Sequence, residues 1–274
     1  MKKILFVCDG DNFPAGAFNF IKKIQGFEPV TLKGLFFSGV ALQQLIFPEY
    51  IPYAIPQVEL KDVEKHALIK SRERFIDQCK SYGIRYDIEE YEDGWDKDQF
   101  IRETRFADLA LISEQLFCKE AFGEQPNSIM EEALRVAECP VLIVPESFSG
   151  IEHIVVAYDG KRESVFALKQ FSNLFAGYDE LPVEFVYINE DESEEIPDRE
   201  LLQEYTNAHY NAGNIARLHF HAGHSFSKWL QGKKDTLLVA GAFSRSGPSM
   251  LFRPSFVNQM IRKNAVPIFI AHYV

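Results

Sequence analysis

Short apolar runs recur along the chain, and segments in which apolar residues follow helical spacing separate them. The runs do not alternate strictly between apolar and polar residues, a pattern typical of parallel strands that are buried on both faces. Strands that alternate with helices in this way indicate an α/β fold. The predicted strands are Ile4–Cys8, Val30–Phe37, Arg85–Tyr91, Leu109–Ile112 and Val141–Val144 in the first half, and Ile151–Tyr158, Val183–Ile188, Ile215–Phe220, Thr236–Ala240 and Val266–Ala271 in the second.

Helices are predicted between these strands. The clearest example carries Val165, Leu168 and Phe171 at helical spacing. In the second half the predicted helices are Glu163–Phe175, Glu200–Ala212, Ser225–Leu230 and Ser255–Lys263. The first half follows the same alternation of strand and helix.

The two halves of the chain repeat each other, which is a strong indication of domain organisation. Each half opens with an apolar run that ends in Asp-Gly, and apolar runs after an aspartate and after a proline return later in the same order. The matched segments are Lys2–Gly10 with Glu152–Gly160, Ala107–Ile112 with Lys234–Val239, Cys139–Val144 with Val266–Ile270, and Ser128 with Ser255 at the start of a helical pattern. We therefore predict two packed domains, residues 1–147 and 148–274, each with a five-stranded parallel sheet flanked by helices.

Composition narrows the classes of function. The chain has 274 residues, of which 46% are hydrophobic, and this is enough for two cores of ordinary size. Lysine and arginine number 29 against 40 acidic residues, so the formal charge is −11. A chain of this charge is repelled by nucleic-acid backbones and by anionic lipid surfaces. We expect neither nucleic acid nor a membrane as a partner.

The N-terminus and the cysteines favour a cytoplasmic protein. No run approaches the roughly 18 apolar residues that cross a bilayer, and the first apolar run meets Asp9 and Asp11 too early for a signal peptide. The four cysteines lie far apart, which argues against a zinc ribbon or a redox pair. We predict reduced, mostly buried thiols.

Candidate ligand-binding residues follow the predicted strands. In open parallel sheets, ligands bind beyond the carboxyl ends of the strands. Asp9 and Asp159 end the first strand of each half, Ile188 ends a second strand, and Gly241 follows a fourth. The segment from Gly241 runs through glycines and serines to Ser255 at a predicted helix N-terminus, where backbone N–H groups would favour an anion.

These segments resemble the universal stress protein family in its tandem two-domain form, over essentially the whole chain. Val156–Gly160 with Ser164 is similar to the family's first strand and helix, Asp235–Gly241 to its fourth strand, and Val266–Ile270 to its last. The resemblance implies two Rossmann-like domains of the adenine nucleotide alpha hydrolase type. It also implies pairing of the two domains.

Family members that bind ATP carry glycine, two residues, glycine, nine residues, and then glycine followed by serine or threonine. In the second half Gly241 and Ser255 occupy the outer positions of this pattern, whereas Ser244 and Pro254 replace two glycines. Pro254 removes a backbone N–H that a phosphate would use, although proline suits the first turn of a helix. By the resemblance, ATP with magnesium would bind Asp159 near the ribose or metal, Ile188 at the base, and Gly241, Ser244 and Ser255 at the phosphates.

The first half departs further from this pattern. Glu114–Phe117 stands in place of the glycine turn, and a glutamate there would repel phosphate. Only Asn127-Ser128 is retained at the helix start. By the family comparison the first half is a structural copy without a nucleotide site.

The remaining motifs give weaker indications of function. His219, His221 and His224 lie within six residues, and on a strand His219 and His221 share one face, so a zinc pair is geometrically allowed. Without an evident third ligand on that face we predict no metal site. The acidic runs Glu89–Asp93 and Glu190–Glu195 are expected to be solvated loops. The insertion Phe47–Pro56 either contacts a partner or covers its own core. The chain has no Gly-x-Ser-x-Gly elbow and no Walker glycine loop.

The sequence thus favours a stress-associated binding or regulatory protein without strong catalytic activity, which takes an adenine nucleotide in its second domain. Slow ATP hydrolysis and a ligand-free scaffold for a protein partner stay open as alternatives. The family resemblance implies that the two domains pair through their last strands, Val141–Val144 and Pro267–Ile270. A homodimer of the whole chain stays open as a further alternative.

Overall fold

The computed structural model describes residues 1–8, 13–37, 57–92, 94–114, 116, 128–188, 195–218, 226–233, 235–241 and 266–271. By its internal contacts the chain divides into two compact units, Met1–Cys139 and Pro140–Val274. This division falls before the boundary that the sequence repeat suggests after residue 147, which stays a prediction. No helix in the described part of the chain combines the length and apolar character that crossing a membrane requires.

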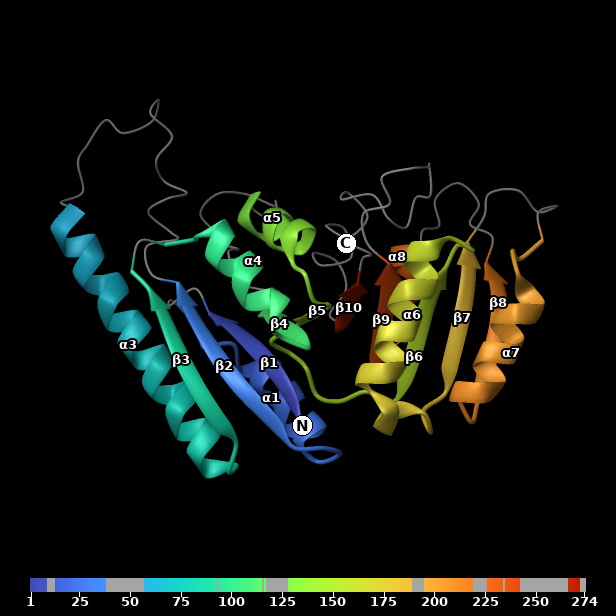
Figure 1. Cartoon of the computed structure of the whole chain (residues 1–274), viewed down its shortest axis with the longest axis horizontal. Coiled ribbons are helices and arrows are strands. Elements are labelled where there is room, and N and C mark those ends of the chain that lie inside the picture. The colour runs from blue at the N-terminus through green and yellow to red at the C-terminus, as the bar shows by residue number, and fades with distance from the viewer. Residues whose placement is uncertain are drawn as a thin grey trace. The chain divides into compact units, whose positions relative to one another are not determined.

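The first unit is a parallel sheet with helices on both faces (Figure 1). Its strands lie in the order β3-β2-β1-β4, and each neighbouring pair is parallel. The elements are β1 (Lys2–Cys8), α1 (Ala15–Gln25), β2 (Val30–Phe37), α3 (Gln57–Ser81), β3 (Arg85–Tyr91), α4 (Lys97–Arg105), β4 (Leu109–Ser113) and α5 (Ser128–Val136).

Aromatic rings fill the two faces of this sheet. On one face the Phe6 ring of β1 contacts Phe18 of α1 and Phe75 of α3, with ring centroids 5.8 and 5.4 Å apart. On the other face the Phe37 ring contacts Trp95, 5.3 Å away, just before α4. On the first face, Gly34 of β2 leaves room for the Phe75 and Phe36 rings, because a Cβ there would lie 3.2 Å from the Phe75 ring and closer still to Phe36.

The second unit repeats the arrangement with strand order β10-β9-β6-β7-β8, all parallel. On one face Phe171 packs against Phe269, and Phe185 packs against Tyr210. The elements are β5 (Val141–Val144), β6 (His153–Tyr158), α6 (Arg162–Leu174), the 3₁₀ turn Ala176–Tyr178, β7 (Val183–Ile188), α7 (Arg199–His209), β8 (Gly213–Leu218), α8 (Phe226–Gln231), β9 (Thr236–Gly241) and β10 (Ile268–Ala271).

The last strand predicted for the first half extends the sheet of the second unit. β5 pairs with β10 in the antiparallel direction, with Ile143 opposite Ile268 and Val141 opposite Ile270. This pairing is why the compact second unit begins at Pro140 rather than after residue 147. Within the second unit, β5 and β10 are the strands that the family resemblance implies as partners.

The predicted α/β fold is confirmed, and most strand bounds agree with the sequence pattern. The two outer strands differ from expectation, since β3 and β8 are largely exposed rather than buried on both faces. Part of the acidic run expected in a loop, Glu89–Tyr91, belongs to β3. Helix α7 ends at His209 instead of Ala212, because the extended backbone of Tyr210 ends the helix and leads into β8.

The described cysteines, Cys8, Cys79 and Cys139, are buried thiols outside any disulfide, as predicted, whereas Cys118 lies outside the described residues. Burial raises the pKa of Cys79 to about 12, and burial together with Asp108 raises the pKa of Cys139 to about 12. Only the thiolate is nucleophilic, so the reactive fraction falls roughly a thousandfold from that of an ordinary thiol.

We therefore expect Cys79 and Cys139 to resist iodoacetamide in the folded protein and to react fully once the protein is unfolded in urea. Mass spectrometry of the tryptic peptides measures each cysteine separately. Equal labelling rates in the folded and the unfolded protein would contradict the burial of these thiols.

Candidate functional site

The turn between β6 and α6 places a buried carboxylate at a helix N-terminus. The Asp159 side chain is 7% exposed, and its Oδ1 accepts a hydrogen bond from the Lys161 backbone N–H at 3.0 Å. The other oxygen, Oδ2, is buried, and no group in the described part of the chain donates a hydrogen bond to it. The Lys161 ammonium lies 3.8 Å from it. A carboxylate oxygen accepts hydrogen bonds and binds cations, so this atom lacks an interaction that a ligand is able to supply.

Ser164 holds this turn in shape. Its hydroxyl donates to the Lys161 carbonyl at 2.9 Å and lies 3.5 Å from the Asp159 backbone N–H. The residue is 1% exposed and sits in the first turn of α6. The Asp159 carboxylate is thereby fixed next to the positive end of the helix dipole.

Gly241 brings the end of β9 against the same helix turn. A Cβ at this position would lie 2.5 Å from the backbone carbon and oxygen of Glu163 and 2.8 Å from the Ser164 nitrogen. Only glycine allows so close an approach of strand to helix. The family resemblance assigned this glycine to the phosphates of a ligand, and the structure shows a packing reason for it.

Two of the five residues predicted for the site thus meet at the first turn of α6, namely Asp159 and Gly241. Ile188 ends β7, the strand that pairs with β6, so its backbone lies at the same edge of the sheet. Ser244 and Ser255 lie outside the described residues, as do Pro254, Asp9, His219, His221, His224 and the insertion Phe47–Pro56. Their predicted roles stay predictions.

The start of α7 also contacts this turn, which the sequence pattern did not indicate. The Tyr158 hydroxyl donates to the Pro197 carbonyl at 2.9 Å. Gly160 has a positive φ of 73°, and a Cβ on it would lie 2.5 Å from Cβ of Pro197. The Asp-Gly dipeptide was a signal for the turn, whereas the contact with Pro197 joins residues that are 39 positions apart.

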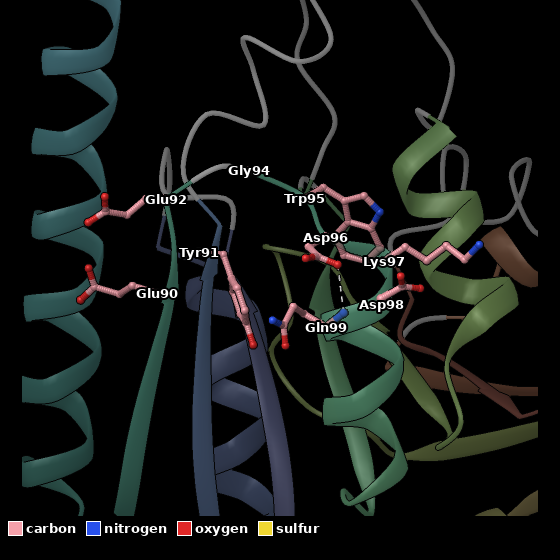
Figure 2. Close-up of a pocket in the computed structure, with 9 residues that line it drawn as sticks. All are labelled: Glu90, Tyr91, Glu92, Gly94, Trp95, Asp96, Lys97, Asp98 and Gln99. Carbon is pink, nitrogen blue, oxygen red and sulfur yellow. Dashed lines mark hydrogen bonds between the residues drawn. The ribbon is translucent and has the colours of Figure 1, made fainter.

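A cavity of about 590 Å³ lies in the first unit, at the end of β3 and the start of α4. Figure 2 shows Glu90 and Glu92 directed toward α3, and Tyr91 and Gln99 directed toward each other. Asp96 caps α4 by accepting from the Gln99 backbone N–H at 3.0 Å. The lining residues are Glu90, Tyr91, Glu92, Gly94, Trp95, Asp96, Lys97, Asp98 and Gln99.

The charge of this cavity disfavours phosphate. Its lining has four carboxylates and one lysine, and the pKa of Tyr91 is raised by burial and by nearby carboxylates, Glu103 first. Glu90 is already paired with Arg72 at 2.7 Å. Over the described ranges, no group of three His, Cys, Asp or Glu side chains is arranged to hold a metal ion. Carboxylates in this number repel the phosphates of a nucleotide, so this cavity is not favoured as a nucleotide site. The absence of a site from the first half stays a prediction.

A second cavity, of about 430 Å³, lies in the second unit at the amino-terminal ends of β6, β7 and β8. Its rim includes Glu184 and Lys233, which form an ion pair. Ligands of parallel sheets bind at the opposite, carboxyl ends of the strands. This location does not favour it as the ligand site.

Among the solved structures that match over nearly the whole chain are universal stress proteins and a protein of unknown function. A universal stress protein from Archaeoglobus fulgidus DSM 4304 matches with a TM-score of 0.66 and 11% identity, over 98% of both chains. A functionally unknown protein from Pseudomonas aeruginosa PAO1 matches with a TM-score of 0.60 and 13% identity, over 99% of this chain and 92% of that one. A putative universal stress protein from Pseudomonas aeruginosa UCBPP-PA14 matches with a TM-score of 0.59 and 12% identity, over 99% and 93%.

No protein-family model and no curated protein sequence matches the chain. At 11 to 13% identity, the matches to solved structures concern the fold. They confirm the two α/β halves that the sequence pattern predicted and the tandem universal-stress fold that the family resemblance implied.

Proposed function

We propose that this chain, which has the tandem universal stress protein fold, is a regulatory protein that binds an adenine nucleotide in its second unit and does not turn it over. The site is the first turn of α6 together with the ends of β6 and β9. The first unit serves as a structural copy, because the lining of its cavity is acidic.

One observation carries this proposal: the Asp159 Oδ2 atom is buried at a helix N-terminus without a hydrogen-bond donor among the described residues. Burying a charged oxygen without a partner costs free energy, unless a ligand supplies the missing interaction. A hydroxyl of a ribose or a magnesium ion is the kind of group that an acceptor-only carboxylate oxygen binds.

The neighbouring residues suit an anionic ligand. Lys161 carries its ammonium 3.8 Å from Asp159, and the N-terminus of α6 favours negative charge. Gly241 keeps side-chain atoms away from the end of β9. In this proposal Asp159 holds the sugar or the metal, Ile188 lies at the base, and Gly241, Ser244 and Ser255 lie at the phosphates.

Asp159→Asn is expected to weaken binding of ATP with magnesium at least tenfold. The amide keeps the shape of the side chain but replaces Oδ2 by a donor, which neither accepts from a hydroxyl nor binds a cation. Hydrogen bonds to charged groups contribute enough for a change of this size. Isothermal titration calorimetry measures the dissociation constants of the wild type and the variant.

The control is Asp179→Asn, which removes an exposed carboxylate of the same unit and should leave the affinity unchanged. If the wild type gives no heat and no thermal shift with ATP and magnesium, the nucleotide proposal is wrong and a ligand-free scaffold is favoured. Equal affinity in the wild type and Asp159→Asn would remove Asp159 from the site. Release of radiolabelled phosphate during turnover would instead favour a slow ATPase.

A further inference from the structure

The segment Pro197-Asp198, here called the strap, contacts the residues on both sides of Asp159. The strap carbonyl at Pro197 accepts from the Tyr158 hydroxyl at 2.9 Å. The proline ring lies against Gly160, where a Cβ would approach it to 2.5 Å. The strap therefore contacts both chain neighbours of Asp159.

The strap has a strained backbone at its second residue. Asp198 has φ 49° and ψ 34°, in the left-handed region, and it begins α7 without a capping hydrogen bond from its side chain. Residues other than glycine pay a free-energy penalty in this region, and such conformations persist only where neighbouring contacts maintain them. The Tyr158 hydrogen bond and the Pro197–Gly160 packing are the contacts that maintain this one.

The Tyr158 hydroxyl keeps the proton with which it donates a hydrogen bond to the strap. Burial, together with the nearby carboxylates of Asp198 and Asp159, raises its pKa to about 12. The phenol therefore keeps its proton throughout the neutral range, and a phenol with its proton is able to donate to a carbonyl. The ring itself is 2% exposed and fixed within β6.

We infer that the strap regulates access to the Asp159 carboxylate, and that a ligand reaches Oδ2 when the Tyr158–Pro197 hydrogen bond breaks and the strap moves away. This inference rests on the proposed function for the identity of the ligand, but access to Asp159 is a property of the protein alone. Two states, closed and open, exchange without a ligand, and a ligand that binds the open state shifts the population toward it.

Tyr158→Phe is expected to open the strap, because phenylalanine keeps the ring and removes the donor. We expect the labelling rate of Asp159 to rise about fivefold, as the loss of one hydrogen bond predicts. The measurement is carboxyl footprinting of the whole protein with a carbodiimide and glycine ethyl ester, read at Asp159 by mass spectrometry.

The matched control is Tyr210→Phe, which removes a tyrosine hydroxyl bound to Ser172 elsewhere in the same unit. Its Asp159 labelling should equal that of the wild type. A second opening variant, Pro197→Ala, retains the carbonyl but loses the ring that packs on Gly160, and it should also raise labelling. Unchanged labelling in both Tyr158→Phe and Pro197→Ala, or an equal rise in Tyr210→Phe, would overturn the inference.

Titration with ATP and magnesium separates this inference from the proposed function. If the wild type binds, Tyr158→Phe should bind about fivefold more tightly, since a larger fraction of molecules is open; an unchanged affinity would overturn regulation by the strap. If no variant binds while labelling rises as expected, the nucleotide proposal fails and the strap is supported. Binding by Tyr158→Phe alone would support both.

Discussion

Phe6→Ala is expected to lower the free energy of unfolding of the first unit by about 3 to 5 kcal/mol, the usual range for removing a buried aromatic ring. Phe6 is 0% exposed, and its ring lies 5.4 to 5.8 Å, centroid to centroid, from those of Phe13, Phe18 and Phe75. These rings belong to separate elements, so the cavity left by alanine cannot be filled by one local adjustment. A loss of this size is a large part of the stability of a small unit.

Urea unfolding followed by the fluorescence of Trp95 measures this loss. The chain has two tryptophans, so the second, Trp229, is replaced by phenylalanine in all samples. The control is Phe106→Ala, since Phe106 is 73% exposed and its removal should change the free energy by less than about 0.5 kcal/mol. Similar shifts in the two variants would contradict the packing around Phe6.

The strands were predictable because their signals are local. Val30–Phe37, Arg85–Tyr91 and Val183–Ile188 agree at both ends with β2, β3 and β7. Each is bounded by glycine, proline or polar turn residues, and such boundaries are encoded within a few residues. The repeat then supplied the order of the elements, since each half had to follow the same path.

Element ends set by distant contacts were not predictable in this way. Helix α7 stops before Tyr210, whose ring packs on Phe185 and whose hydroxyl lies 2.6 Å from Ser172 of α6. These partners are far from Tyr210 in sequence, so the prediction, which used helical spacing alone, placed the end of the helix at Ala212. The exposure of β3 and β8 is likewise not encoded locally, because it depends on the place of each strand in the strand order.

The candidate site was predictable in part. The rule that ligands lie beyond the carboxyl ends of parallel strands was enough to select Asp159 and Gly241. It gave no information on Lys161, which depends on the path of the turn, or on Pro197, which is 39 residues from its partner Tyr158. The structure was also needed to explain why residue 241 is a glycine, since sequence alone does not show which backbone atoms approach it.

Gly241→Ala is expected to destabilise the second unit by about 2 to 3 kcal/mol, whether or not a nucleotide is present. The added methyl group would overlap the Glu163 carbonyl and the Ser164 nitrogen, at 2.5 and 2.8 Å. These are backbone atoms of α6, so relief requires the helix to move away from β9, and overpacking of this kind has such a cost. Urea unfolding followed by Trp229, with Trp95 replaced by phenylalanine, measures the change.

The matched control is Gly150→Ala, in the connection before β6, where an added Cβ meets no atom within 4 Å. Its φ lies outside the left-handed region, so alanine should be neutral or slightly stabilising there. If Gly241→Ala were as stable as the wild type but bound ATP poorly, the glycine would serve the ligand and not the packing. Loss of stability in the ligand-free protein would instead show that the contact of β9 with α6 requires glycine without any ligand. The first glycine of the family's ATP-binding pattern would then not by itself be evidence of nucleotide binding.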